Sequence, residues 1–137
     1  MKKRLISISI ALLCAAVFHL TCKKGPAPLP EHVIRVVSEA DFQERVLRSN
    51  LPVLVDFFAD WCYPCRVLSP LVAQVASDRA DQVTVVKVDV DDSPGLARRY
   101  GIKGLPTLVL FADGKEFKRL TGLTDEAGVL SMLPKKQ

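Results

Sequence analysis

Residues 53–65, VLVDFFADWCYPC, decide the fold of this chain. Over residues 53–58 both faces of an extended segment are apolar except at Asp56, as in a strand of a parallel sheet that is covered on both sides. Cys62 and Cys65 follow after a short break, and Pro64 suits the first turn of a helix, where its missing N–H is not needed. The stretch therefore predicts a buried strand that leads into a helix with Cys62 at its N-terminus.

The predicted helix N-terminus gives Cys62 a chemical role. A thiol attacks only as its thiolate, and the free N–H groups and the dipole at a helix N-terminus favour a negative charge. Cys65 lies further along the same helix, near enough to close a small disulfide loop. We expect one cysteine to attack and the other to resolve.

Length and composition allow one ordinary domain. The 137 residues are 49% hydrophobic and 25% charged, which is typical of a chain that forms a core. The net charge of +4 arises near the start, where residues 1–24 hold five of the nineteen basic residues and none of the fifteen acidic ones. The remaining near-neutral domain has no electrostatic footprint for nucleic acid.

Residues 1–22 have the three parts of an export signal: a basic start, an apolar run over residues 5–20 and a boundary before Lys23. An uncleaved anchor is the alternative, although the run of about 16 residues is shorter than the roughly 20 that a span needs. Leu20-Thr21-Cys22 loosely resembles the lipobox of bacterial lipoproteins, so Cys22 is a candidate for lipidation. Each alternative places the domain outside the cytoplasm, in the periplasm or attached to the outer side of the membrane.

Residues 23–32 contain three prolines and no periodicity. They predict a tether to a domain over residues 33–137, or a disordered tail if the leader is cleaved. Cys14 and Cys22 lie in the leader, which leaves Cys62 and Cys65 as the only cysteines of the domain. Disulfides persist in exported proteins, so this pair is expected to carry redox chemistry.

The domain alternates strand and helix patterns in the order β-α-β-α-β-α-β-β-α. Ser38 and Ser93 are expected N-caps, Pro70 a kink within the second helix, and Asp113-Gly114 a hairpin turn. Strands are predicted at residues 33–37, 53–58, 83–90, 107–111 and 116–121, and helices at residues 38–50, 62–76, 93–100 and from 124 onward.

This order predicts an α/β fold: a central mixed β-sheet with helices on both faces, three parallel strands and a closing antiparallel hairpin. Active sites of such sheets lie beyond the carboxyl ends of the parallel strands, which is where Cys62 follows its strand.

Trp61-Cys62-Tyr63-Pro64-Cys65 after the strand with Asp56, and Gly104-Leu105-Pro106-Thr107 before the fourth strand, resemble the thioredoxin family. The likeness covers residues 33–133 in order and spacing and implies the thioredoxin fold. It implies that Cys62 attacks and Cys65 resolves. It also matches Pro106 to the family's cis-proline, which abuts the cysteines and leaves the Leu105 backbone free to pair with an extended substrate segment.

The resemblance matches Asp56 to the family's buried aspartate and Lys87 to its strand lysine. Burial predicts a raised pKa for Asp56, which suits it to exchange a proton with Cys65, directly or through water. A structural ion pair between Asp56 and Lys87 is the alternative, and both can hold. Trp61 is expected to be a lid beside the cysteines, with core packing as its alternative.

The residues flanking the cysteines complete the expected substrate site: Trp61, Tyr63, Pro64, Leu105 and Pro106. Tyr63 replaces the small glycine of cytosolic thioredoxin, so the family's reduction potential does not carry over. Residues 59–62, Leu105 before the proline and residues 121–125 also resemble the exported C-terminal domain of the transmembrane thiol:disulfide interchange protein, which carries electrons across the bacterial inner membrane. That likeness favours reduction over oxidation.

These features predict an exported, monomeric thiol-disulfide oxidoreductase that reduces protein disulfides without a metal or organic cofactor. In an oxidising compartment a reductase needs a membrane electron donor, and without one the same residues would act as an oxidase or isomerase. A peptide-binding module with little turnover is a further alternative.

Zinc binding and a purely structural disulfide are disfavoured. Two cysteines are half of a zinc site, and His19 and His32 lie in the leader and tether. Closing so short a loop removes little chain entropy.

Overall fold

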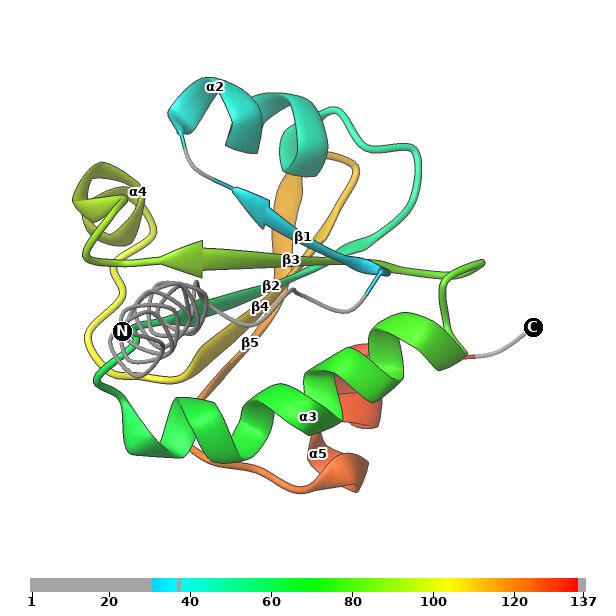
Figure 1. The fold of residues 1–137 in the computed structure, drawn as a ribbon. Coiled ribbons are helices and arrows are strands. Elements are labelled where there is room, and N and C mark those ends of the chain that lie inside the picture. The colour runs from blue at the N-terminus through cyan, green and yellow to red at the C-terminus, as the bar shows by residue number, and fades with distance from the viewer. Residues whose placement is uncertain (1–30, 37, 136–137) are drawn as a thin grey trace, which may run out of the picture.

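The computed structural model describes residues 31–36 and 38–135, which form a mixed sheet between two layers of helices (Figure 1). In the sheet β1, β3 and β2 are parallel, β4 is antiparallel to β2, and β5 is antiparallel to β4. The sheet order is β1 (Val33–Val36), β3 (Thr84–Asp89), β2 (Val53–Phe58), β4 (Thr107–Ala112) and β5 (Lys115–Thr121). The predicted α/β fold with a closing hairpin is confirmed.

Two pairs of helical segments cover the two faces of the sheet (Figure 1). One face carries α3 (Tyr63–Asp78) and α5 (Glu126–Met132), and the other carries α2 (Glu39–Phe42), its π-helical continuation η1 (Gln43–Leu47) and α4 (Pro94–Arg99). Among the described residues, none of these helices is long and apolar enough to cross a membrane. The expected leader, residues 1–22, and tether residues 23–30 lie outside the described residues.

The central strand β2 contributes to both cores because its side chains alternate between the faces. All six of its residues are buried. Val55 and Phe57 pack toward α2 and α4, whereas Leu54 packs toward α3 and α5. Each such apolar side chain contributes roughly 1.5–3 kcal/mol by its burial. The alternation places Asp56 on the face covered by α3, the helix that carries both cysteines.

The helix ends agree with the predicted caps. The Ser38 hydroxyl accepts a hydrogen bond from the N–H of Asp41 at 3.1 Å, and α3 runs on through Pro70. Ser93 does precede Pro94, but its buried hydroxyl caps no N–H of α4. Ser93 is thus the N-cap residue by position, as predicted, and its ψ of 57° lies outside the extended region that N-cap residues usually occupy.

The β4–β5 hairpin turns at Asp113-Gly114, as predicted. Both residues have positive φ, 51° and 72°, which a two-residue turn of type I′ requires. A Cβ added to Gly114 would lie 2.7 Å from the backbone oxygen of Leu47, so glycine is needed for space as well as conformation. The turn fixes the pairing of β4, whose first residue follows the loop next to the cysteines.

Candidate active site

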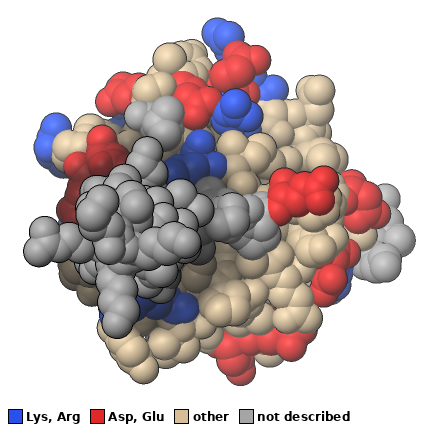
Figure 2. All heavy atoms as spheres, viewed as in Figure 1, with Lys and Arg blue, Asp and Glu red and all other residues tan. Residues whose placement is uncertain are grey.

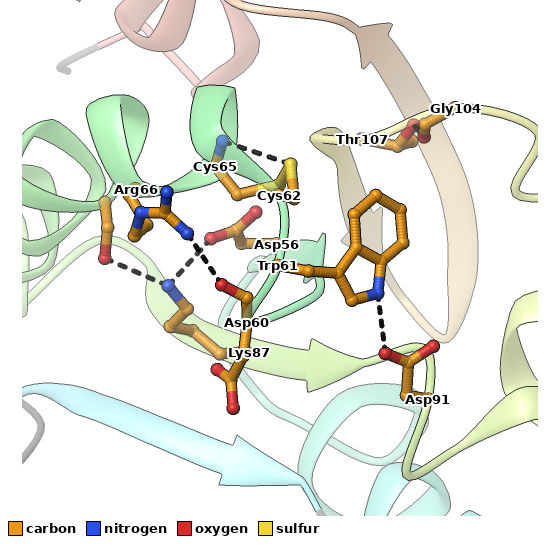
Figure 3. The surroundings of a disulfide bond; sticks show 11 residues. Asp56, Asp60, Trp61, Cys62, Cys65, Arg66, Lys87, Asp91, Gly104 and Thr107 are labelled. Carbon is orange, nitrogen blue, oxygen red and sulfur yellow. Dashed lines mark hydrogen bonds and ion pairs between the residues drawn. A yellow bond between two sulfur atoms is a disulfide. The ribbon is translucent and has the colours of Figure 1, made fainter. Parts of the chain in front are cut away.

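Cys62 occupies the N-cap of α3, as the sequence predicted. Its Sγ accepts the N–H of Cys65 at 3.2 Å, and Pro64 lies in the first turn, where no N–H is needed (Figure 3). The two cysteines form a disulfide with Cα atoms 5.3 Å apart. They are only 3% and 2% exposed, and the Cys62 sulfur faces the backbone N–H of Cys65.

Asp56 and Lys87 form a buried ion pair between neighbouring strands. They are in register on β2 and β3, and Lys87 Nζ lies 3.2 Å from Asp56 Oδ2. Lys87 also donates to Ser69 Oγ at 3.0 Å and lies 4.4 Å from the centre of the Phe58 ring. The structural pairing given above as the alternative role of Asp56 is therefore present.

The Asp56 carboxyl is nevertheless poorly satisfied. It is 0% exposed, and apart from the ion pair no donor within the described part of the chain hydrogen-bonds to its oxygens. Burial raises the pKa of Asp56, and the charge and hydrogen bond of Lys87 offset only part of that rise. In Figure 3 this carboxyl lies between Lys87 and the two cysteines. A carboxyl with a raised pKa beside a disulfide is suited to move a proton.

The segment before β4 closes the site on its other side. The Leu105-Pro106 peptide bond is cis, and Leu105 packs against the cluster that contains both cysteines. The carbonyl of Pro106 accepts the N–H of Gly122 at 2.8 Å. Thr107 Oγ1 donates to the carbonyl of Gly104 at 2.7 Å. These bonds hold the loop against the cysteines, at the position implied by the resemblance.

Trp61 is 69% exposed, so core packing is excluded. Its Nε1 donates a hydrogen bond to Asp91 Oδ2 at 2.8 Å (Figure 3). Together with Leu105 it lines a groove of about 340 Å³ that begins beside the cysteines. The rest of the lining comes from Val90, Pro94, Ala97, Arg98, Ile102, Lys103 and Gly104.

A family model for thioredoxin matches residues 33–135, nearly the whole described domain. The chain belongs to the thioredoxin family. It is 43% identical over 103 residues to thioredoxin 1 of Synechococcus elongatus, and the aligned region covers 75% of this chain and 96% of that protein. It is 45% identical over 97 residues to a thioredoxin of Mycobacterium bovis, covering 71% of this chain and 84% of that protein.

A solved structure of a mutant thioredoxin from Halobacterium salinarum has a TM-score of 0.68 and 37% identity, covering 77% of this chain and 91% of that one. Thioredoxins are thiol-disulfide oxidoreductases, and the Cys62–Cys65 disulfide lies at the active-site position. The protein is therefore a thiol-disulfide oxidoreductase, and this part of the prediction is confirmed.

Tyr63 is the first residue of α3 and follows Cys62 directly. Its ring is 69% exposed, and the guanidinium of Arg66 lies 5.6 Å from the ring centre. Arg66 also donates to the carbonyl of Asp60 at 2.9 Å. It thus braces the loop before Cys62, a role that the sequence did not reveal.

The sequence patterns also did not identify Asp91, whose carboxylate accepts the indole N–H of Trp61. A signal existed, because Asp91 follows the parallel strand β3 at the edge of the sheet where active sites form.

Across residues 31–36 and 38–135, no three His, Cys, Asp or Glu side chains gather as metal ligands.

Proposed function

We propose that this protein is an exported reductase of protein disulfides, with Cys62 as nucleophile and Cys65 as resolving cysteine. The observation that carries the proposal is the position of Cys62 at the N-cap of α3, three residues from its partner. Residues 1–22, with their basic start and apolar run, support export.

In the first step the Cys62 thiolate attacks one sulfur of a substrate disulfide. A new S–S bond forms between Cys62 and the substrate, the substrate's own S–S bond breaks, and its second sulfur leaves as a thiolate that takes up a proton. Backbone N–H groups at the start of α3 stabilise the attacking thiolate. The product is a mixed disulfide.

In the second step Cys65 loses its proton and attacks the Cys62 sulfur. The ionised carboxylate of Asp56 accepts that proton, directly or through water, and Lys87 supports the carboxylate from β3. The Cys62–Cys65 bond forms and the remaining substrate thiolate leaves and is protonated. The substrate has gained two electrons and two protons, and the protein dithiol has lost them.

The substrate is an extended polypeptide segment held beside the cysteines. The Leu105 backbone, next to cis-Pro106, offers hydrogen bonds to such a segment, and Trp61 forms the opposite wall of the groove. Tyr63 and Pro64 meet the substrate at the start of α3. The apolar lining with few charges fits polypeptide side chains in general, and so supports several protein substrates.

Continued reduction outside the cytoplasm requires an electron donor in the membrane. A donor of this kind would reduce the Cys62–Cys65 disulfide by the reverse of the same exchange. We propose that the chain works as a monomer, held near that donor by the tether of residues 23–32 and by its leader or a lipid on Cys22.

The reduction potential of the Cys62–Cys65 pair, measured against glutathione, tests the direction. A value near the roughly −270 mV of thioredoxin supports a reductase, whereas one near the roughly −120 mV of the strong periplasmic oxidant would make the protein an oxidase. The exchange roles have their own test, because Cys65→Ser should trap mixed disulfides and Cys62→Ser should not. Equal trapping by both variants would contradict the assignment.

A further inference from the structure

A second buried carboxylate, Asp89, ends strand β3 and takes no part in the steps above. It is 4% exposed. Its Oδ2 accepts a hydrogen bond from Arg35 at 3.2 Å, and its Oδ1 accepts the backbone N–H of Asp91 at 3.0 Å. Both oxygens of the carboxylate are thus satisfied, unlike those of Asp56.

Arg35 reaches this carboxylate from the neighbouring edge strand β1. Its Nη2 also donates to Asp92 Oδ2 at 3.0 Å, and its guanidinium lies 5.6 Å from the centre of the Phe58 ring. One side chain therefore ties two acidic residues around the β3–α4 connection to β1. Because a buried carboxylate needs a compensating cation, Arg35 is what keeps the Asp89 carboxylate in place.

The connection continues to the active site through Asp91. The backbone of Asp91 is bound by Asp89, and its side chain accepts the indole N–H of Trp61 at 2.8 Å (Figure 3). Since Trp61 is largely exposed, packing alone does not fix the direction of its ring. A continuous series of hydrogen bonds thus runs from β1 to the wall of the groove.

We propose that Arg35 is a positioning residue for Trp61, holding the indole against the substrate groove through Asp89 and Asp91. Without Arg35, the Asp89 carboxylate turns toward water and releases the Asp91 N–H, and the indole loses its fixed orientation. This inference rests on the proposed function only in that Trp61 contacts the substrate.

The fluorescence of Trp61 reports its mobility directly, because it is the only tryptophan of the chain. Arg35→Met in the full chain should lower the anisotropy of the reduced protein. It should also raise KM for a peptide disulfide about fivefold at unchanged kcat, the effect expected for one lost hydrogen bond. The rate with a small aromatic disulfide, which does not extend along the groove, should stay the same.

Arg119→Met is the matched control. Arg119 has a similarly exposed side chain, 30% against 31% for Arg35, and likewise two partners, Glu116 and the carbonyl of Tyr100, but it lies on the opposite edge strand. It should leave anisotropy and KM unchanged. Adding Asp89→Asn to Arg35→Met removes the unpaired charge but keeps an oxygen that accepts the Asp91 N–H, so it should restore both values.

Asp89→Ala keeps the test decisive if Arg35→Met does not fold. It removes the acceptor and leaves no buried charge, so it should also lower the anisotropy and raise KM about fivefold. Wild-type anisotropy in Asp89→Ala, or in a folded Arg35→Met protein of reduced stability, would overturn the proposal. Trp61→Ala tests separately whether Trp61 contacts the substrate. An unchanged KM for the peptide disulfide in this variant would show that Trp61 is not a wall of the groove. The anisotropy of Arg35→Met and Asp89→Ala would still decide whether Arg35 positions Trp61.

Discussion

Replacing Asp56 by Asn should stabilise the oxidised protein at neutral pH. The carboxyl is completely buried and its oxygens have one ion-pair partner, Lys87, within the described part of the chain. Desolvation of a buried carboxylate costs several kcal/mol, which a single cation at 3.2 Å only partly offsets. After the substitution Lys87 keeps its hydrogen bond to Ser69. We expect a net gain of about 1–3 kcal/mol in the free energy of unfolding, the usual cost of a buried polar group whose atoms lack hydrogen-bond partners.

The gain should depend on pH with a definite sign. Because burial raises the pKa of Asp56, the folded state holds its proton at pH values where the unfolded state has released it. Stability conferred by the protonated carboxyl is therefore complete below the ordinary Asp pKa of 3.8 and is lost as pH rises through the higher folded pKa. The advantage of Asp56→Asn should grow across that window and then stay constant.

Urea unfolding of both oxidised proteins from pH 4 to 9 measures this difference. A gain of about 2 kcal/mol corresponds to a midpoint shift of roughly 1 M. Asp89→Asn is the control, since that buried carboxylate has both oxygens satisfied. It should cost about 1–2 kcal/mol at pH 7. A destabilised Asp56→Asn protein at pH 8, or a difference that does not change with pH, would refute the reasoning.

Other substitutions test other features. Asp56→Asn should slow release of mixed disulfides at pH 7 by about tenfold or more, since water replaces the carboxylate as proton acceptor; an unchanged single-turnover rate would leave Asp56 structural. Gly114→Ala should lower the free energy of unfolding by about 1–3 kcal/mol, through its positive φ and the clash with Leu47, and urea unfolding checks this. Cys22→Ala should move the protein from the membrane to the soluble fraction if Cys22 is lipidated, whereas retention would favour a spanning leader. Tyr63→Ala should cost about 0.5–1 kcal/mol through its lost contact with Arg66, again measured by urea unfolding.

Local patterns predicted the elements of the fold well because they depend on neighbouring residues. The alternation around Asp56 correctly indicated a doubly covered strand, and Pro64 correctly indicated a helix that begins at Cys62. Ser93 was also correctly identified as the N-cap residue of α4, although its side chain makes no capping hydrogen bond. The order of strands in the sheet was also outside what local patterns reveal.

The parts of the site that the sequence did not predict are contacts between segments far apart in the chain. Arg35 and Asp89 are 54 positions apart, and Trp61 and Asp91 are 30 apart. Such pairs become neighbours only once β1 lies beside β3 and β3 beside β2, and nothing in the local sequence specifies these pairings. The pairing of Asp56 with Lys87 was anticipated only because the family resemblance supplied the register.

The position of Cys62 at the N-cap of α3 explains how a common helix cap favours a reactive thiol here. Three helices of this domain begin with a side chain that accepts the N–H three residues on: Ser38 at 3.1 Å, Asp125 at 2.9 Å and Cys62 at 3.2 Å. Oxygen caps stabilise a helix in any state. A neutral thiol is a weak acceptor, and a thiolate is a much better partner for the same N–H groups. At Cys62 the capping interaction therefore favours the ionised form, which supports the proposed attack by Cys62 and the proposed resolving role of Cys65, already in the helix and on the side of Asp56.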